Sequence, residues 1–350
     1  MSAPPLPAPR AAAHDEPPPP VRMVQMLAGF QVSQALYAVA KLGVATALTD
    51  GPRSVGELAR TLGADETALR RLLRDLAGFG LFTSVPPDSY ALTPLGATLA
   101  AGQPGSVRDL ALTWMETHYA PFGDLLTTVR TGEPAARRFY GQPFFDWLSA
   151  DPEQVARFTG AMAGLTDGIK VGAVAGYSLP GGPVVVDVGG ADGAVLHTVL
   201  AADPDPARRG VVLDLPHVVP AASARLAGSP LAGRVDVVGG DFFEAVPAGD
   251  VYLLSMVLHD WDDDAALRLL RSVAAAARPG ARLVALELVL PPDDRPHLSR
   301  AIDLTMLGML TGRERTPADF DALLGAAGFR LDRVAETPTP LSIVEATLTG

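Results

Sequence analysis

From residue 183 onward, valine-rich runs alternate with segments of helical pattern. The runs are PVVVDVGG, RGVVLDLP, RVDVVGGDFF, DVYLLSMVLHDW and ARLVALELVL, with helices expected at 194–203, 217–226, 263–277 and in TPADFDALLGAAGF. LDRVAET and LSIVEATL predict two final strands. Continuous apolar strands alternating with helices indicate a parallel sheet covered on both faces. The sequence therefore predicts an α/β fold with a ligand beyond the carboxyl ends of the strands.

Length and charge limit the classes of protein that fit this chain. Its 350 residues suffice for two domains, and the formal net charge of −11 makes nucleic acid an unlikely partner. There is no cysteine, which excludes disulfides and thiolate zinc sites and agrees with a cytoplasmic location. Residues 1–20 are proline-rich and predict a disordered tail. The most apolar segment, 23–48, is interrupted by polar residues, so we expect no membrane span.

Residues 21–105 predict a mainly helical first domain. Segment 21–48 is apolar on both faces, which hints at a subunit interface. Residues 54–96 read as two helices followed by two short strands, the pattern of a winged helix. Arg70, Arg71 and Arg74 could contact DNA from the second helix, but the acidic chain and the lack of lysine in this segment favour packing and dimerisation.

Residues 106–180 are predicted to be helical and are rich in aromatic side chains. Such a stripe is usually hydrophobic core, but it could also line a pocket for a flat aromatic ligand. The sequence alone favours core and leaves the pocket as the alternative.

The ends of the first three strands predict a nucleoside site. Asp187, Gly189 and Gly193 lie in a glycine-rich turn that opens a helix, where backbone can approach a ligand closely. Asp214 ends the second strand, where a carboxylate can accept both hydrogens of a ribose diol. At the third strand, Asp241 followed by an aromatic suits an adenine, with Phe242 covering the ring. Each feature alone also fits a turn built for packing.

The fourth strand end carries the best candidate for acid–base chemistry. Of the six histidines, only His259 is expected at the carboxyl end of a central strand, where an imidazole faces the crevice. Glu287, inside the apolar run LVALELVLP, needs a partner, either an arginine or His259. Glu314 in GRERT is a second candidate, although its flanking arginines make a plain ion pair an alternative.

Taken together, these motifs resemble the caffeate-type, S-adenosylmethionine-dependent small-molecule O-methyltransferases, including bacterial members that modify aromatic polyketides and other antibiotics. VVDVGGADG, LDLPHVV, GDFFEAVPAGDVYLLSMVLHDW, ELVLP and GRERT occur in the family's order, and the resemblance runs from about residue 21 to 347. It implies a Rossmann-like class I methyltransferase sheet over 181–350, behind a winged-helix dimerisation domain over 21–105 and a helical segment over 106–180.

The resemblance also implies roles for individual residues. His259 would be the general base, flanked by Glu287 and Glu314. The cofactor-binding candidates are Gly189, Asp214, Asp241, Phe242, Ser255 and Arg157. Ser255 stands where plant members carry lysine, and Ala191 replaces the usual middle glycine, which a methyl group tolerates if φ there is negative. The expected acceptor pocket draws on Trp114, His118, Phe122, Phe158, Met162, Met306 and Met309.

The implied reaction is methylation of a hydroxyl on an aromatic small molecule by a cytoplasmic homodimer, without a metal, a membrane or nucleic acid. Some relatives of this scaffold hydroxylate or decarboxylate instead, and that remains the main alternative. An NAD-dependent dehydrogenase is disfavoured by the glycine spacing and by GDFF. A winged-helix regulator that senses a ligand is disfavoured by the net charge.

Overall fold

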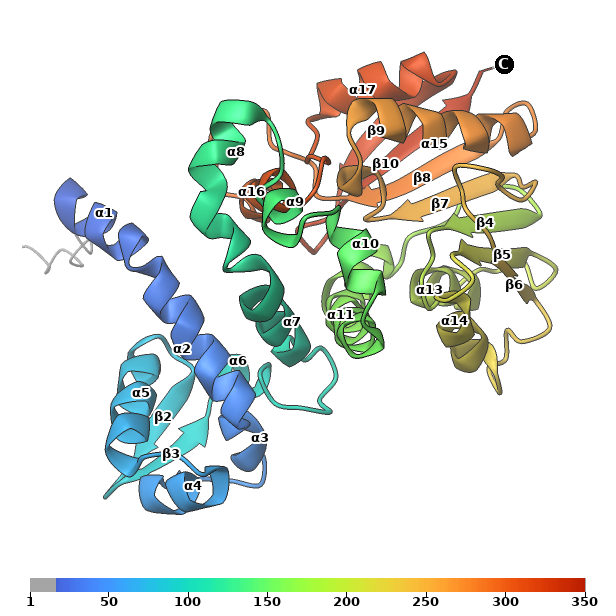
Figure 1. Cartoon of the computed structure of the whole chain (residues 1–350). Coiled ribbons are helices and arrows are strands. Elements are labelled where there is room, and N and C mark those ends of the chain that lie inside the picture. The colour runs from blue at the N-terminus through green and yellow to red at the C-terminus, as the bar shows by residue number, and fades with distance from the viewer. Residues whose placement is uncertain (1–16, 350) are drawn as a thin grey trace, which may run out of the picture.

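A computed structural model describes residues 17–349, so most of the predicted tail lies outside the described residues. The chain folds into a small N-terminal unit and a larger unit built on a seven-stranded sheet, joined through a set of helices (Figure 1). The strand order of the large sheet is β6-β5-β4-β7-β8-β10-β9. The order reverses between β4 and β7, and ligands of such sheets bind at this switch point.

The predicted alternation of strands and helices is present in the large sheet. Its strands are β4 (Val184–Val188), β5 (Arg209–Asp214), β6 (Val235–Gly239), β7 (Val251–Ser255), β8 (Arg282–Glu287), β9 (Phe329–Glu336) and β10 (Ser342–Leu348). The helices among them are α13 (Ala194–Ala201), α14 (Val219–Leu226), η4 (Leu258–Asp260), α15 (Asp263–Ala276), α16 (Leu298–Met309) and α17 (Pro317–Ala326). β4 to β8 are parallel, whereas β10 runs antiparallel to both of its neighbours. Helix α16 was not expected.

Local sequence signals fix where the helices of this unit begin. Asp262 caps α15 by accepting a hydrogen bond from the backbone N–H of Ala265. Thr316 and Asp319 form a capping box at the start of α17. Both helices pack on one face of the sheet, and α13 and α14 pack on the other. The two clusters hold the strand ends in fixed positions.

The N-terminal unit contains the predicted helix-turn-helix and strands. It comprises α1 (Pro19–Leu27), α2 (Gly29–Leu42), α3 (Val44–Ala47), β1 (Arg53–Ser54), α4 (Val55–Leu62), α5 (Glu66–Gly78), β2 (Phe82–Val85), β3 (Ser89–Leu92) and α6 (Pro94–Ala97). Arg70 on α5 is bound to Asp88 and Glu66, and Arg74 to Asp75. Two of the three arginines singled out in the sequence therefore form ion pairs within the N-terminal unit.

Helices between the two units carry the aromatic residues. They are α7 (Arg108–Thr113), η1 (Trp114–His118), η2 (Pro121–Asp124), α8 (Leu125–Thr131), α9 (Ala135–Tyr140), α10 (Phe144–Ser149), α11 (Pro152–Leu165), η3 (Thr166–Lys170) and α12 (Val171–Val174). Phe144, Leu148 and Met309 form a buried cluster with Ala136, and Phe122 and Phe158 pack against it. Part of the aromatic residues in 106–180 therefore belong to the hydrophobic core, as the sequence favoured.

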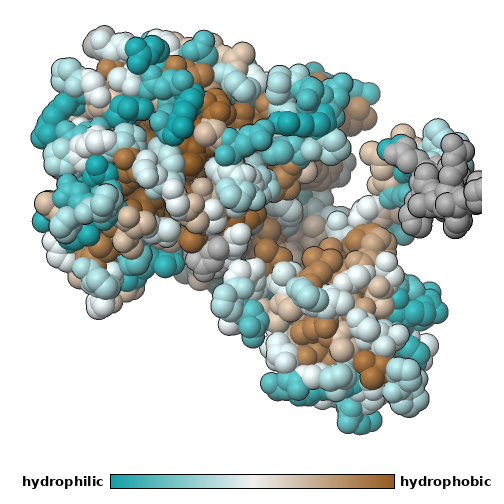
Figure 2. Space-filling model, turned by 180° about the vertical axis from the view of Figure 1, so that it is seen from behind, coloured by the Kyte–Doolittle hydropathy of each residue, from teal (hydrophilic) through white to brown (hydrophobic). Residues whose placement is uncertain are grey.

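Large apolar side chains are exposed along the first two helices. They are Val21, Met23, Val24, Met26, Leu27 and Phe30. Figure 2 shows the N-terminal unit joined to the larger unit through a narrow waist, with hydrophobic residues on its surface. Within residues 17–349, none of the helices combines the length and the hydrophobicity needed to cross a bilayer.

Packing of α15 on the sheet generates a stability prediction. Leu269 is fully buried in the cluster between α15 and the sheet. We expect Leu269→Ala to lower the free energy of unfolding by about 2–5 kcal/mol because it leaves a cavity. Arg271→Ala, an exposed change on the same helix, should alter it by less than about 0.5 kcal/mol. Urea unfolding monitored by circular dichroism measures both, and equal effects would show that α15 is not anchored as described.

Candidate functional site

The carboxyl ends of five neighbouring strands bring the candidate residues to one edge of the sheet. Gly189 follows β4, Asp214 ends β5 and Asp241 follows β6. Ser255 ends β7, with His259 four residues later, and Glu287 ends β8. The parallel arrangement places all of these positions around the switch point between β4 and β7.

The turn after β4 needs its glycines because of both backbone conformation and space. Gly189 and Gly193 have φ values of 70° and 73°, and a Cβ on Gly189 would lie 3.0 Å from Val257 Cγ2. The negative φ that would let Ala191 replace glycine without strain is not present, because its φ is 51°. An alanine in this left-handed region costs roughly 1–2 kcal/mol. The backbone N–H of Ala191 donates to Asp214 Oδ2 at 2.8 Å, which helps to hold the strained turn.

Asp214 and Asp241 also receive backbone hydrogen bonds. Asp214 Oδ1 accepts from the N–H of Leu215 at 2.7 Å, and burial raises the pKa of Asp214. Asp241 Oδ1 accepts from the N–H of Phe243 at 2.8 Å. The ring of Phe242 meets Trp261 edge-on with centroids 6.1 Å apart. These bonds orient each carboxylate at its strand end, where its remaining lone pairs can meet a nucleoside.

Lys170, a partly buried lysine near β7, was not singled out from the sequence. Lys170, on η3, donates from Nζ to the carbonyl oxygen of Ser255 at 3.1 Å. Burial lowers the pKa of Lys170, and the nearby Asp187 and Glu287 carboxylates oppose that shift. Asp187 is itself buried, which raises its pKa to about 7, and neither of its oxygens has a hydrogen-bond partner among the described residues. Ser255 Oγ is also buried and unpartnered. A lone lysine inside a helical pattern gives no signal of such a position.

His259 is held by Glu314 rather than by Glu287. His259 Nδ1 is 2.8 Å from Glu314 Oε1, and both side chains are buried. Glu287 Oε1 instead accepts the backbone N–H groups of Val257 and Leu258, at 3.2 and 3.0 Å, and Oε2 has no partner. Because the Glu314 carboxylate can only accept a hydrogen bond, Nδ1 of His259 carries a proton and donates it to that bond. Nε2 is then the nitrogen that can take up or release a proton. Glu287 fixes the segment that leads into His259.

The arginines beside Glu314 do not pair with it, so the alternative of a plain ion pair is wrong. Arg313 and Arg315 both bind Asp263. Arg315 is almost completely buried and also donates to the carbonyl oxygens of Leu258 and Trp261, at 2.7 and 2.9 Å. A Cβ on Gly312 would collide with the carbonyl oxygen of His259. The GRERT segment therefore packs against the His259 loop through the backbone at Gly312 as well as through the side chain of Glu314.

The carboxylates around His259 set its charge. Burial alone lowers the pKa of His259, but Asp260, Glu314 and Glu287 outweigh it and raise the pKa to about 9. Burial raises the pKa of Glu287 to about 7. His259 Nε2 lies 3.4 Å from Asp260 Oδ1. The imidazole of the free protein is therefore mostly protonated at neutral pH.

The sequence suggested no metal-ligand cluster, but folding brings His259, Glu287 and Glu314 together with ligand atoms within 4.8 Å of one another. Protein groups already engage this set. His259 Nδ1 is bonded to Glu314, and Glu287 Oε1 accepts two backbone N–H groups. Among the described residues, Glu287 Oε2 is the buried oxygen of this set that has no hydrogen-bond partner.

The acceptor-pocket candidates divide between a cavity and the core. Trp114, His118 and Phe122 line a cavity of about 560 Å³ together with Met115, Tyr119 and Thr305. Met306 and Met309 are buried on α16, and Phe158 packs against the cluster that contains Met309. Met162 lies on α11 and is partly buried. Arg157 is bound to Glu116 and Glu153 rather than aimed at the glycine turn.

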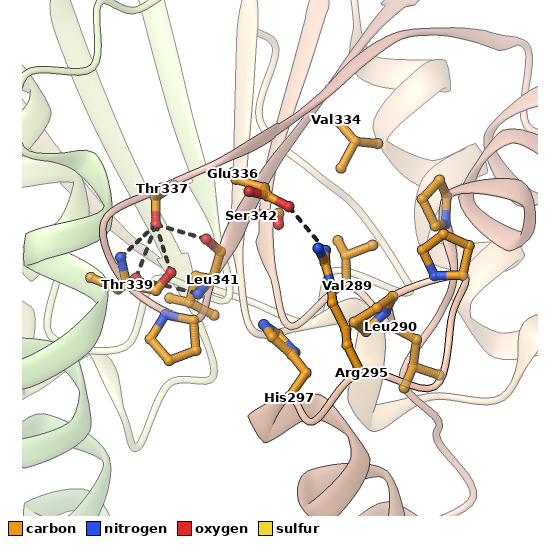
Figure 3. A pocket seen from close by; sticks show the side chains of 14 residues that line it. Val289, Leu290, Arg295, His297, Val334, Glu336, Thr337, Thr339, Leu341 and Ser342 are labelled. Atoms are coloured by element: carbon orange, nitrogen blue, oxygen red, sulfur yellow. Dashed lines mark hydrogen bonds and ion pairs between the residues drawn. The ribbon is translucent and has the colours of Figure 1, made fainter. Parts of the chain in front are cut away.

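A further cavity of about 350 Å³ lies between the segment after β8 and the β9–β10 hairpin (Figure 3). Arg295 donates to Glu336 at 3.0 Å, and Thr337 Oγ1 is hydrogen-bonded to Thr339 and to the carbonyl oxygen of Leu341. These polar side chains satisfy one another, as Figure 3 shows. The residues predicted for cofactor and acceptor binding do not line this cavity.

Comparison with known proteins agrees with this geometry. Residues 122–330 match the sequence model of the O-methyltransferase domain, and residues 24–102 match the O-methyltransferase dimerisation domain. A phenazine O-methyltransferase of Lysobacter antibioticus is 41% identical over 93% of this chain and 95% of its own.

Two solved structures share the fold and contain cofactor or product. The calicheamicin biosynthesis methyltransferase CalO1, bound to S-adenosylhomocysteine, has a TM-score of 0.83 at 32% identity and covers 95% of this chain and 98% of its own. An O-methyltransferase of neocarzinostatin biosynthesis, in complex with S-adenosylmethionine and 2-hydroxy-5-methyl naphthoic acid, has a TM-score of 0.76 at 35% identity, covering 91% and 96%. The chain belongs to the S-adenosylmethionine-dependent O-methyltransferase family and carries that family's dimerisation domain.

Proposed function

We propose that this enzyme methylates a hydroxyl group of an aromatic small molecule, a phenolic or polyketide natural product, with His259 as general base. The buried hydrogen bond between His259 and Glu314 carries the proposal, because it engages Nδ1 and fixes the imidazole at the carboxyl edge of the sheet, with Nε2 on the side of Asp260. Proton removal by a positioned imidazole typically contributes 10²–10⁴-fold to a rate. The aromatic cavity on η1 and the names of the relatives support the acceptor class.

Features of the glycine turn and of β7 fit S-adenosylmethionine. The turn presents backbone where a side chain on Gly189 would crowd Val257, and Asp187 and Ser255 contribute buried polar atoms that have no partner among the described residues. Asp214 would hold the ribose hydroxyls, and Asp241 and Phe242 the adenine. When bound, the cofactor supplies an activated methyl group.

The protein's own part in the reaction is to position the acceptor and to take up its proton. His259 Nε2 accepts the hydroxyl proton, and Glu314 stabilises the resulting imidazolium through Nδ1–H. Glu287 and Arg315 hold the loop through hydrogen bonds with its backbone groups, and the charge of Glu287 also helps to raise the pKa of His259. Most of the rate enhancement then comes from holding the acceptor hydroxyl at Nε2.

The exposed apolar residues of α1 and the start of α2 support assembly as a homodimer. A monomer would leave Met23, Met26 and Phe30 more than half exposed to water. A second copy of the chain would cover these side chains, which agrees with the match to the dimerisation domain.

Ligand binding tests the cofactor assignment directly. S-adenosylhomocysteine at about a hundred times its dissociation constant should add roughly 2.7 kcal/mol of stability and raise the melting temperature by several degrees. NADH should have no effect. A thermal shift assay with both ligands, and with S-adenosylmethionine, measures this. A shift with NADH alone would contradict the assignment of the glycine turn.

Removing the imidazole tests the general base. We expect His259→Ala to lower turnover roughly 10²–10⁴-fold while S-adenosylhomocysteine binding stays unchanged, because His259 lies outside the glycine turn. Glu287→Gln is the matched control. Its amide oxygen can still accept both backbone N–H groups, so turnover should fall much less. Product mass distinguishes methyl transfer from hydroxylation or decarboxylation, and full activity of His259→Ala would remove His259 as base.

The raised pKa of His259 predicts a pH dependence. Since only the neutral imidazole can accept a proton, kcat/KM should rise with pH and level off near the folded-state pKa of about 9. The same shift stabilises the fold. That contribution is fully present below the ordinary pKa of 6.5 and is lost as the pH rises through about 9.

Glu314→Gln removes one of the carboxylates that raise the pKa of His259, so its rate profile should level off at a lower pH. Initial rates from pH 6 to 10, with an acceptor identified by product mass, give both profiles. A flat profile for the unmodified enzyme over this range would contradict the proposed role of His259.

A further inference from the structure

His118 occupies a π-helical turn at the edge of the 560 Å³ cavity. The backbone N–H of Tyr119 donates to the carbonyl oxygen of Trp114 at 3.0 Å, which is the wide turn of η1. Such turns occur frequently at functional sites. Tyr140 anchors the turn by donating to the carbonyl oxygen of Thr117 at 2.6 Å. The ring of His118 packs edge-on against Phe144, so its orientation is fixed.

The hydrogen bonds of Thr117 determine the tautomer of His118. Thr117 Oγ1 lies 2.7 Å from the carbonyl oxygen of Thr113 and 2.7 Å from His118 Nδ1. A hydroxyl has one hydrogen, and the carbonyl can only accept it. Thr117 therefore donates to Thr113 and accepts from His118, so Nδ1 carries a proton. In the neutral ring, Nε2 is then an unprotonated acceptor.

The environment keeps this imidazole neutral, in contrast to His259. Burial lowers the pKa of His118 to about 4, and among the residues whose side chains are described no carboxylate opposes the effect. Nε2 of His118 forms no hydrogen bond with any of the described residues. It is not among the completely buried polar atoms that lack a partner. His118 is thus unsuited to take up a proton at neutral pH, but it can accept a hydrogen bond from a molecule in the cavity.

The cavity is linked to the proposed base through one helix. Thr305 of α16 lines it, and Asp303 of the same helix accepts the backbone N–H of Glu314 at 2.9 Å. Gly308 of α16 lies so close to Phe122 that a Cβ would come within 2.9 Å of the ring. A flat acceptor between η1 and α16 would contact Trp114 and Phe122 and present its edge to His118.

We infer that His118 determines acceptor specificity: its Nε2 accepts a hydrogen bond from a second O–H or N–H group on the aromatic acceptor, distinct from the hydroxyl that is methylated. The inference rests on the proposed function and names the class of acceptor as aromatic rings with two hydrogen-bond donors. A ring with one hydroxyl would leave Nε2 without a partner when the acceptor displaces water from the cavity.

Paired acceptors test the inference. With 2,7-dihydroxynaphthalene and 2-naphthol as probes, kcat/KM for the diol should exceed that for the mono-ol about tenfold in the unmodified enzyme. His118→Phe keeps an aromatic ring but removes the acceptor nitrogen, so the ratio should fall close to one. Trp114→Phe, which alters the cavity without changing its hydrogen-bond acceptors, should lower both rates and keep the ratio. An unchanged ratio in His118→Phe would overturn the inference.

Nitrogen NMR of histidine-labelled protein decides the tautomer without any turnover. The His118 signals are those missing from the His118→Phe spectrum. We expect a protonated Nδ1 and an unprotonated Nε2 from pH 5 to 8, with the Nε2 signal shifting when the diol binds. A protonated Nε2 would overturn the inference even if both phenols are methylated. If neither phenol is methylated, the proposed function fails, and an Nε2 signal unmoved by the diol would then overturn the inference as well.

Discussion

The buried hydrogen bond between His259 and Glu314 depends on the close approach of two backbone segments. Gly312 allows the segment before Glu314 to touch the backbone at His259, and Arg315 binds the carbonyl oxygens on either side of the imidazole. The 2.8 Å bond is therefore a consequence of backbone packing as much as of side-chain attraction. A buried carboxylate that pairs with an imidazole avoids the cost of an isolated charge, which explains why Glu314 is tolerated in the interior.

Two histidines, His259 at the carboxyl edge of the sheet and His118 at the cavity of η1, have opposite properties because their surroundings differ. His259 is surrounded by Asp260, Glu287 and Glu314, which raise its pKa, whereas burial alone acts on His118 and lowers its pKa. One imidazole is therefore suited to exchange protons and the other to accept a hydrogen bond. The two histidines differ in pKa because of their environment and not because of their residue type. The same principle assigns acid and base roles to pairs of titratable groups in other enzymes.

The site residues that lie at the ends of periodic strands could be predicted from the sequence. Those whose place depends on contacts between segments far apart in the chain could not. Strand ends locate Asp214, Asp241 and His259 because parallel strands share one carboxyl edge. Lys170 and the left-handed φ of Ala191 leave no local signal, since the first reaches the site from a separate helix and the second depends on a bond to Asp214. Helix α16 follows a proline-rich loop outside the strand–helix alternation, so the pattern did not reveal it.

The charges near the switch point also bear on which cofactor the turn can accept. Asp187, Glu287 and Asp260 lie near the partly buried Lys170, and their charges oppose the lowering of its pKa by burial. Burial already raises the pKa of these three carboxyl groups, and a pyrophosphate there would raise it further, because like charges are costly at low effective dielectric. A cofactor with a sulfonium and an ammonium group would instead gain favourable interactions with the same carboxylates. The electrostatics thus separate an adenosyl sulfonium from a dinucleotide on grounds independent of glycine spacing, which is the weaker of the two arguments when taken alone.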